Sequence, residues 1–403
     1  MELLSIIVLI VLLLISAGVG FYFHSIDRPR EHRKNRNERL VEAVLKPMSK
    51  PVKTNYPEIK HDNGVPKPLQ RINYRTILSA SHVAPLKLRE ADLFYTLRKD
   101  IFDLKEEEYK KNFQQGKLEG GGNLGFSGAA FFFTPGNKKF IVKSLPNSFE
   151  WHFFYETLLT AYGHYVREVK DTLLARITDS LCNFDVRVWV WLRLGVPGHF
   201  IVMQNLLEGF DKEKGWEQWD LKPKDYLRAD LILPKSAEEE ERLLFKKDGI
   251  KLSKKNYDLL ADLCFRDTAF LAAKGVVDYS LLLGRFPNDG SMKLDEPQNF
   301  FTGVVSSDKK YVYRISIIDF FFSHRTVPLL IKNASQIVHP VKPDAEFTFT
   351  DKPKHYAEKF MQMLEEYCKI EGPEQEIKKA ARQRSVDNLS MIPAIFLQPG
   401  QVV

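Results

Sequence analysis

The N-terminus carries an uncharged run, residues 3–23, that is rich in Leu, Ile and Val. About 20 apolar residues at ~1.5 Å each match the ~30 Å hydrocarbon core of a bilayer. Only Glu2 precedes the run, whereas basic residues outnumber acidic ones just after it, so the positive-inside rule places the downstream chain in the cytosol. A cleaved signal peptide is the alternative, but the run is long and no Lys or Arg precedes it. We therefore expect residues 1–26 to form a single-pass transmembrane anchor.

The segment after this run, residues 27–85, has the composition of a linker. It combines several prolines and many Lys and Arg residues with few apolar runs, so it cannot bury enough surface to fold alone. Basic residues beside a membrane are drawn to anionic lipids, and residues 28–60 are the expected contact with an anionic membrane surface. A plain solvated tether is the alternative. The charged residues 371–403 are expected to form a flexible tail.

Charge and cysteine content narrow the class of protein. The 403-residue chain has a formal net charge of +7, which favours an anionic partner, either nucleic acid or a membrane surface. Nucleic-acid binding is not expected, because the basic residues gather beside the apolar run and no aromatic platform is interleaved with them. The three cysteines are widely spaced, which argues against a disulfide framework or a zinc site and fits a reducing compartment.

Residues 86–370 show the mixed periodicities of an α+β domain. Apolar residues at three- and four-residue spacing predict helices, and alternating or short apolar runs bounded by turns predict strands. The expected helices cover residues 88–115, 148–168, 257–274 and 354–369, and the expected strands cover residues 129–133, 140–143, 187–191, 199–203 and 312–318. Polar residues 285–310 are expected to form a loop, and the glycines at 116 and 120–122 to end the first helix.

A glycine-rich segment precedes the first expected hairpin. Gly125, Ser127 and Gly128 lie before its first strand, and Lys143 ends its second strand. Glycines allow backbone N–H groups to approach phosphate oxygens, and a lysine beneath the same loop can neutralise them. The pattern is weak by itself, because glycine-rich hairpins are common and a lysine at a strand end is usually solvated. The segment has no GxxxxGK[ST] pattern, so it is not a Walker-type phosphate loop.

Acidic residues at strand ends supply the other half of a phosphoryl-transfer site. Asp278 stands between a small-residue turn and an apolar run, and Asp319 follows an expected strand. A carboxylate that faces a phosphate loop suits Mg²⁺, which prefers hard oxygen ligands beside substrate phosphates. A solvated turn is the ordinary alternative for an isolated Asp such as Asp278. Glu150 and Glu156, in the second expected helix, could each pair with Lys143, and the sequence does not choose between them.

These segments, in this order, resemble the motifs of the phosphatidylinositol phosphate kinase family over about residues 88–370. The strongest is Val277-Asp278-Tyr279-Ser280-Leu281-Leu282-Leu283-Gly284, which is close to the family's MDYSLLLG segment. The others resemble its phosphate loop, its lysine strand, the start of its DLKGS motif, its metal-binding aspartate segment and its closing YAxRF helix: Gly125-Phe-Ser-Gly128, Phe140-Ile-Val-Lys143, Asp220-Leu-Lys222, Ile317-Ile318-Asp319 and His355-Tyr-Ala-Glu-Lys-Phe360.

The resemblance implies a two-lobed, protein-kinase-like α+β fold. An antiparallel sheet would lie in an N-lobe of about residues 86–205, followed by a mixed C-lobe of about residues 206–370. The resemblance also implies ATP-dependent phosphorylation of an inositol-ring hydroxyl on a phosphoinositide lipid, with ATP and Mg²⁺ as cofactors. Whether the chain forms a homodimer is left open.

The resemblance assigns roles residue by residue. In these roles, Asp278 and Lys222 are catalytic, Lys143 with Gly125, Ser127 and Gly128 binds ATP, Lys222 and Arg228 bind substrate phosphate, and Asp319 and Asp220 hold Mg²⁺. Phosphoryl transfer depends mostly on positioning and charge stabilisation, and these are the residue types that such chemistry uses.

Three departures from the family pattern bear on activity. Pro223-Lys224 replace the Gly-Ser of the DLKGS motif, and Phe126 replaces a lysine in the phosphate loop. Residues 321–332 lack the paired lysines with which the family docks on membranes and selects its substrate. The choice of phosphoinositide and ring hydroxyl therefore stays open. Two alternatives also remain: a weak or inactive pseudokinase that acts as a phosphoinositide- or protein-binding scaffold, and a kinase-like enzyme for protein or a soluble inositol phosphate.

Overall fold

The computed structural model describes most of the expected domain. It describes residue 48 and residues 87–114, 118–123, 130–145, 147–182, 199–223, 248–290, 292, 294–295, 297–324 and 352–370. The expected transmembrane segment, the tail, strand 187–191, Gly125, Ser127, Gly128 and Arg228 lie outside these ranges. No helix within the described ranges combines the length and the apolar character that a bilayer crossing requires.

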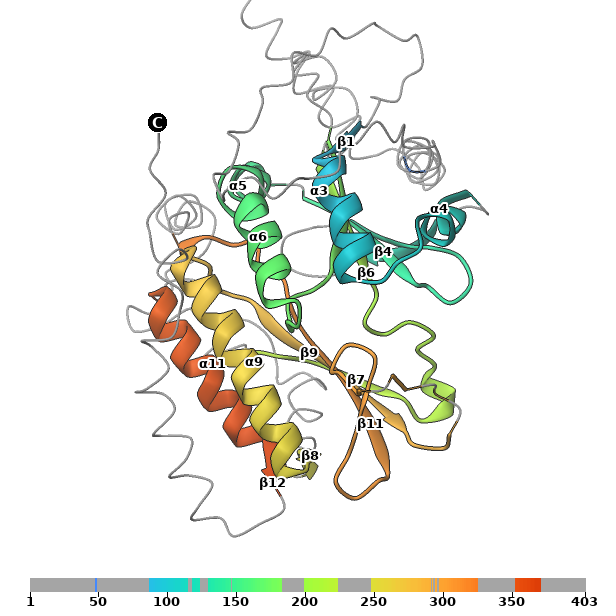
Figure 1. The fold of residues 1–403 in the computed structure, drawn as a ribbon. Helices are drawn as coiled ribbons and strands as arrows, with labels where there is room; N and C mark the ends of the chain where they lie inside the picture. The colour runs from blue at the N-terminus through green and yellow to red at the C-terminus, as the bar shows by residue number, and fades with distance from the viewer. Residues whose placement is uncertain are drawn as a thin grey trace, which may run out of the picture.

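A six-stranded antiparallel sheet forms the upper part of Figure 1. Its spatial order is β1 (Lys87–Arg89), β5 (Ile177–Cys182), β6 (His199–Gln204), β4 (Phe140–Ser144), β3 (Ala130–Phe133) and β2 (Glu119–Asn123). The expected hairpin is confirmed as β3 and β4, and Gly136 supplies the positive φ of 76° in its turn. The antiparallel sheet expected for the first half of the domain is therefore present.

The helix expected over residues 88–115 is wrong in its extent. Its first residues form β1, and the rest divides into α3 (Ala91–Thr96), the π-helical turn η1 (Leu97–Ile101) and α4 (Glu106–Gln114). Asp103 separates the two helical parts in a left-handed conformation with a φ of 50°, through which a right-handed helix cannot continue. The sequence pattern concealed this break, because Phe102 and Leu104 keep the helical spacing of apolar residues.

The glycines at 120–122 also depart from expectation. They do not end a helix but lie in β2, at the edge of the sheet, where the pairing with β3 is irregular between Gly120 and Gly122. Edge strands and bulges tolerate glycine, because few side-chain contacts are lost there. The glycine-rich segment thus begins as a sheet edge that leads toward the expected phosphate loop.

The helical stretch expected over residues 148–168 is confirmed. It consists of α5 (Ser148–Phe153), the π-helical turn η2 (Phe154–Leu158) and α6 (Leu159–Val169). Its aromatic residues are mostly buried, as expected for core packing. A short connection, residues 170–176, then leads from α6 into β5.

A second antiparallel sheet, with four strands, lies below the first in Figure 1. Its order is β10 (Val304–Val305), β11 (Tyr311–Ile318), β9 (Ser280–Pro287) and β7 (Glu217–Leu221). β11 confirms the expected strand over residues 312–318. The expected loop over 285–310 is wrong in part, because β9 continues to Pro287 and β10 lies near its end. β7 was not expected, because its polar residues mask the strand pattern.

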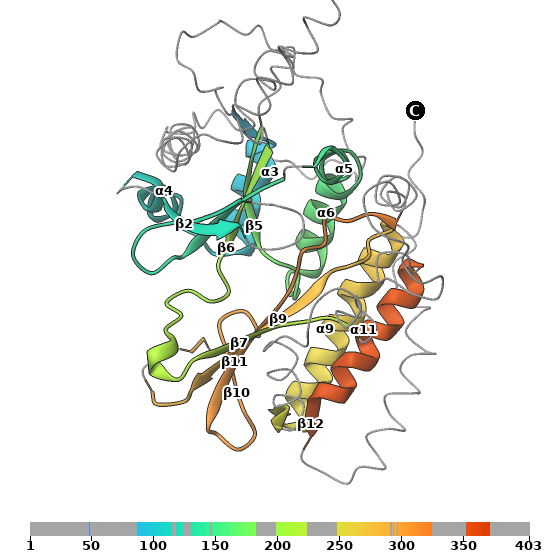
Figure 2. The ribbon, with the colours of Figure 1, turned by 180° about the vertical axis from the view of Figure 1, so that it is seen from behind.

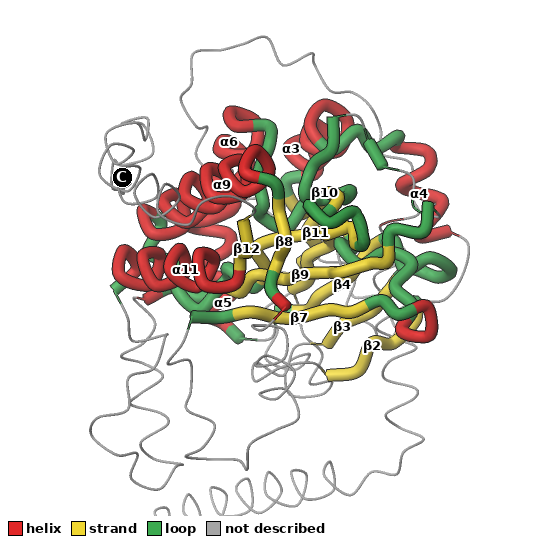
Figure 3. Tube along the Cα trace, turned by 90° about the horizontal axis from the view of Figure 1, so that it is seen from below, coloured by secondary structure: helices red, strands yellow, loops and turns green. Residues whose placement is uncertain are grey.

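Two long helices, α9 (Lys254–Ala273) and α11 (Pro353–Tyr367), run side by side next to the second sheet (Figure 2). Ser253 caps α9 by accepting a hydrogen bond from the backbone of Asn256, and α11 begins with a proline in its first turn. Both helices confirm the expectation. At their ends, β12 (Cys368–Ile370) pairs in parallel with β8 (Ile250–Leu252), as Figure 3 shows from below.

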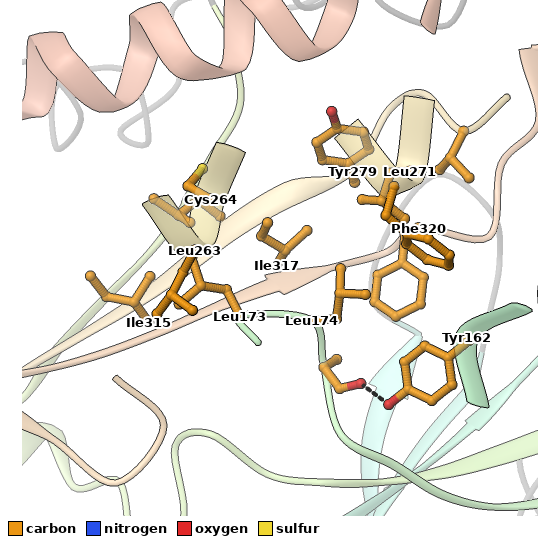
Figure 4. Packing of buried hydrophobic residues seen from close by; sticks show 14 of the residues in the cluster. Tyr162, Leu173, Leu174, Leu263, Cys264, Leu271, Tyr279, Ile315, Ile317 and Phe320 are labelled. Carbon is orange, nitrogen blue, oxygen red and sulfur yellow. Dashed lines mark hydrogen bonds between the residues drawn. The ribbon is translucent and has the colours of Figure 1, made fainter. Parts of the chain in front are cut away.

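One large hydrophobic cluster joins the two sheets. It takes buried side chains from the helices around the first sheet, from β9 and β11, and from α9 and α11. Figure 4 shows a part of it in which Leu173 and Leu174 lie beside Ile315 and Ile317 of β11. The strands that carry the predicted aspartates therefore share a core with the first sheet.

A second, smaller cluster packs between α4 and the first sheet. It contains aromatic residues of both elements, among them Tyr109, Phe113 and Phe140. Met48 also belongs to it and is only 3% exposed. Met48 falls in the segment expected to be a linker, so at least this residue of the segment packs against the domain.

Candidate active site

Lys143 occupies the middle of the first sheet. It lies on β4, in register with Phe131 of β3 and Ile201 of β6. Its ammonium group is 2.5 Å from Oδ1 of Asp319, and the rings of Phe131 and Phe321 lie 5.4 and 5.3 Å from it. The side chain is only 8% exposed. The sheet thus holds a nearly buried cation against the first predicted metal ligand.

Asp319 follows the last residue of β11 and keeps 44% of its side chain exposed. Partial removal from water raises its pKa, but the ammonium groups of Lys143 and, to a lesser degree, Lys222 lower it more. The net pKa lies below the ordinary value for aspartate. At neutral pH the site therefore presents an ionised and partly accessible carboxylate between two lysines.

Lys222 and Asp278 form a second ion pair beside the first. The Lys222 ammonium donates to Oδ1 of Asp278 at 3.0 Å and to the Asp278 backbone carbonyl at 2.9 Å. The pair arises from strand register, because β7 ends at Leu221, which lies opposite Leu281 of β9. This register brings Lys222, which follows β7, next to Asp278, which precedes β9.

Both aspartates adopt a left-handed backbone conformation. The φ angles are 67° at Asp278 and 61° at Asp319. Residues other than glycine seldom occupy this region, and the strain is typical of functional sites. The backbone N–H of Val277 donates to the carbonyl of Phe322 at 3.1 Å, so the segment before Asp278 is joined to the segment after Asp319.

The segment after Asp319 is anchored by consecutive aromatic rings. Each ring packs against the helical stretch of residues 148–169, in the pairs Phe320 with Tyr162, Phe321 with Phe154 and Phe322 with Phe149. The run of three phenylalanines was the pattern that could have predicted the anchor, because aromatic runs next to a site usually pack in a core.

α11 packs against Tyr279, the residue that follows Asp278. The hydroxyl of Tyr356 donates to the backbone carbonyl of Tyr279 at 2.6 Å, and the rings of Tyr356 and Phe360 pack against Tyr279. Tyr279 immediately follows Asp278 and is fully buried. Tyr356 and Phe360, both from the predicted closing-helix motif, therefore fix the backbone next to the ion pair of Lys222 and Asp278.

Glu150 is the glutamate whose charge interacts with that of Lys143. It lies in the first turn of α5, where its carboxylate accepts hydrogen bonds from the backbone and side chain of Asn147 at 3.3 and 3.1 Å. Burial raises the pKa of Glu150, the positive charge of Lys143 lowers it, and the negative charge of Asp319 raises it slightly. Glu156 instead lies at the surface, with its Oε1 2.9 Å from Nδ1 of His152. The structure thereby chooses between the two glutamates.

Comparison of the sequence with models of known protein families gives a match over the part of the chain that contains most of these site residues. The model of the family described as Phosphatidylinositol-4-phosphate 5-Kinase matches residues 112–291. The matched range includes Lys143, Lys222 and Asp278. The match supports a member of the phosphatidylinositol phosphate kinase family. No protein among curated sequences matches the chain.

Asp319 fits the role of a metal ligand that the family resemblance assigns to it. Its carboxylate is ionised, partly exposed and close to two ammonium groups that can take up phosphate charge, which is the setting in which Mg²⁺ joins a carboxylate to nucleotide phosphates. No group of three or more His, Cys, Asp or Glu side chains within the described ranges could hold a metal alone.

Asp220 is the other predicted metal ligand. It is exposed on β7, next to Leu221, which is buried. Side chains alternate along a strand, so Asp220 and Leu221 point to opposite faces of the second sheet. Its role as a metal ligand stays a prediction, as do the roles of the phosphate-loop residues and Arg228 outside the described ranges.

Proposed function

We propose that the chain is a membrane-anchored, ATP-dependent kinase that phosphorylates an inositol-ring hydroxyl of a phosphatidylinositol phosphate. Family membership supports the substrate class. The observation that carries the proposal is the convergence of two Lys–Asp pairs, Lys143 with Asp319 and Lys222 with Asp278, from four separate segments of the chain. Cations for phosphates and carboxylates for metal and acceptor are the groups that phosphoryl transfer requires.

The nucleotide end of the proposed site centres on Lys143. Its ammonium neutralises ATP phosphates, and Gly125, Ser127 and Gly128 offer backbone N–H groups to the same phosphates. Glu150 supplies the negative charge that keeps Lys143 oriented when phosphates approach. Asp319, with Asp220, would hold Mg²⁺, which when bound offsets charge that develops on the transferred phosphoryl group.

The acceptor end of the proposed site centres on Asp278. Its carboxylate orients the ring hydroxyl and accepts its proton as the oxygen attacks the γ-phosphorus, so that the new O–P bond forms while the bond to the β-phosphate oxygen breaks. Lys222, 3.0 Å from this carboxylate, is positioned to stabilise negative charge on the same phosphoryl group. Arg228 adds a cation for the phosphate that the lipid already carries.

The proposed setting is the cytosolic face of a membrane. Residues 1–26 would anchor the chain, and the basic residues 28–60 would lie near anionic lipid. An anchored domain meets a lipid substrate in two dimensions, so it depends less on a basic docking segment such as the one that residues 321–332 lack. Nothing in this proposal requires a dimer.

The deciding experiment is a lipid kinase assay of the full-length chain with labelled ATP and Mg²⁺, on vesicles that each contain one phosphoinositide. Asp278→Asn removes the proposed proton acceptor, and Asp262→Asn changes an exposed carboxylate on α9 that pairs with Arg266. The expected result is labelled lipid from the wild type and Asp262→Asn, and none from Asp278→Asn. Absence of product on every lipid, together with absence of ATP binding, would replace the proposal with the binding-scaffold alternative.

A further inference from the structure

Asp267 is a buried carboxylate that the proposed chemistry does not use. It lies on α9, is 1% exposed, and accepts three hydrogen bonds. The donors are the hydroxyl of Tyr165 at 2.7 Å, the hydroxyl of Thr172 at 2.8 Å and the backbone N–H of Leu173 at 2.6 Å. Burying a carboxylate costs folding free energy unless its oxygens accept hydrogen bonds. Here three donors satisfy the oxygens of this one side chain.

The three donors belong to α6 and to the connection between α6 and β5. The same connection is hydrogen-bonded to β11. The carbonyl of Leu173 accepts from the backbone N–H of Ile317 at 2.6 Å and from the hydroxyl of Ser316 at 2.8 Å, and the N–H of Ala175 donates to the carbonyl of Ile317 at 2.9 Å. Figure 4 shows Leu173 and Leu174 against this part of β11. Asp267 thus binds the backbone N–H of Leu173, while β11 binds the Leu173 carbonyl.

The position of Asp319 follows from these contacts. Ile317 lies two residues before Asp319, whose left-handed backbone turns the carboxylate toward Lys143. Lys143 belongs to the first sheet. The connection that is hydrogen-bonded to Asp267, residues 170–176, leads into β5 of the same sheet. A shift of β11 relative to this connection would change the distance between Asp319 and Lys143.

We propose that Asp267 is a positioning residue for phosphoryl transfer: its carboxylate fixes Leu173 against β11 and so sets Asp319 opposite Lys143. The proposal rests on the proposed function and adds to it a residue outside the site. The contact is specific to a carboxylate or amide, because an apolar side chain would remove this acceptor from two hydroxyls and one backbone N–H. Asp267→Asn keeps one oxygen for Leu173, and its NH₂ group can donate to a hydroxyl.

A matched control separates positioning from general stability. Asp179 is also buried, at 2% exposure, and accepts hydrogen bonds from Arg98 at 2.7 Å and Tyr109 at 3.0 Å. These contacts stay within the first sheet and its helices. Asp179→Ala therefore removes a buried carboxylate without releasing β11.

The first readout is steady-state kinetics of the full-length chain on phosphoinositide vesicles. Asp267→Ala is expected to lower kcat about 10- to 100-fold, because small displacements of catalytic groups have effects of this size. The KM for the lipid is expected to stay within about twofold, because lipid contacts are not displaced. Asp267→Asn restores most of kcat. An equal loss of kcat in Asp179→Ala and Asp267→Ala, at equal loss of melting temperature, would overturn the proposal.

The second readout does not depend on activity. Amide hydrogen exchange is measured at Leu173, Ala175 and Ile317, whose N–H groups make the hydrogen bonds described above. Asp267→Ala is expected to accelerate exchange at all three relative to Asp179→Ala, and unchanged exchange contradicts the positioning role. If the wild type proves inactive on every lipid, the proposed function fails while this result still decides the role of Asp267.

A milder variant covers the case in which Asp267→Ala does not fold. Thr172→Val removes one of the three donors to Asp267 and the acceptor of the Leu174 N–H, which lies 3.1 Å from the threonine hydroxyl. It is expected to accelerate exchange at Leu173 and Ile317 and to lower kcat by a smaller factor than Asp267→Ala does. Wild-type exchange and wild-type kcat in Thr172→Val would overturn the proposal.

Discussion

The ammonium of Lys143 lies 2.5 Å from the carboxylate of Asp319, although 176 positions separate the two residues in sequence. The contact links the middle strand of one sheet to the end of a strand in the other. It pairs a nearly buried ammonium group with a partly exposed carboxylate. In the proposed function, ATP phosphates would replace Asp319 as the partner of Lys143, and the carboxylate would then be available to Mg²⁺.

Replacement of Asp319 by asparagine tests this exchange of partners. Asp319→Asn keeps the size of the side chain and removes its charge, so we expect kcat to fall about 100-fold, as for loss of one group that stabilises the transition state. We also expect weaker Mg²⁺-dependent binding of ATP, measured by titration calorimetry with and without Mg²⁺. Unchanged Mg·ATP binding and turnover would show that Asp319 is not the metal ligand.

Strand-end residues of this site were predictable because sequence pattern and chemistry agree there. The structure confirms the apolar runs before Lys143 and Asp319 as β4 and β11, although β4 extends one residue beyond Lys143, to Ser144. An apolar run predicts a buried strand, and a charged residue at its end must reach a surface or a partner. The core helices α9 and α11 were predictable for the same reason, because each has one continuous apolar face.

Other features were not predictable, because they depend on tertiary contacts. β7 carries polar residues on one face and is a strand because it pairs with β9. The sequence gives no reason to prefer Glu150 or Glu156 as the partner of Lys143. Only the tertiary packing of α5 and η2 buries the first and exposes the second. The break at Asp103 interrupts a regular apolar pattern, so no local rule predicted it.

The two glutamates give a matched pair of variants. Glu150→Gln removes a buried negative charge near Lys143, whereas Glu156→Gln removes an exposed charge six positions along the same helical stretch. Loss of an interaction worth about 1.4 kcal/mol corresponds to a tenfold change, and we expect the KM for ATP in Glu150→Gln to rise by about that factor. Glu156→Gln should match the wild type. Equal KM values for ATP in both variants would remove Glu150 from the site.

The N-terminal anchor makes a separate prediction about location. Deletion of residues 1–26 removes the apolar run and should release the chain from membranes to the soluble fraction at high salt, where the screening of charges weakens the contact of residues 28–60 with anionic lipid. The measurement is flotation of full-length and shortened chains with vesicles at low and high salt. Continued flotation of the shortened chain at high salt would mean that another segment holds it.

Tyr356→Phe tests whether the contact of α11 with Tyr279 positions the neighbouring Asp278. The variant loses the 2.6 Å hydrogen bond to the carbonyl of Tyr279 and leaves that buried carbonyl without this donor. We expect the free energy of unfolding to fall by about 1–2 kcal/mol, measured by urea denaturation. We expect kcat to fall with it, because Tyr279 adjoins Asp278. Met361→Leu, a partly buried change on the same helix, is the control and should leave kcat unchanged.

His199 gives the fold a predictable dependence on pH. Its ring is 8% exposed and stacks on Trp151 with a centroid distance of 4.3 Å. Burial, with the positive charges of Arg89 and His152 nearby, lowers the pKa of His199 to about 4. In the unfolded chain the pKa of histidine is about 6.5, so as pH falls below this value the unfolded state binds a proton that the folded state does not.

The contribution of His199 to stability is therefore complete above pH ~6.5 and is lost as pH falls toward ~4, by about 3 kcal/mol in the free energy of unfolding. His199→Phe keeps the stacked ring and removes the titrating group, so its free energy of unfolding should fall less than that of the wild type over this range. Urea denaturation at several pH values measures the difference. An unchanged, wild-type pH profile in His199→Phe would show that another group carries the dependence.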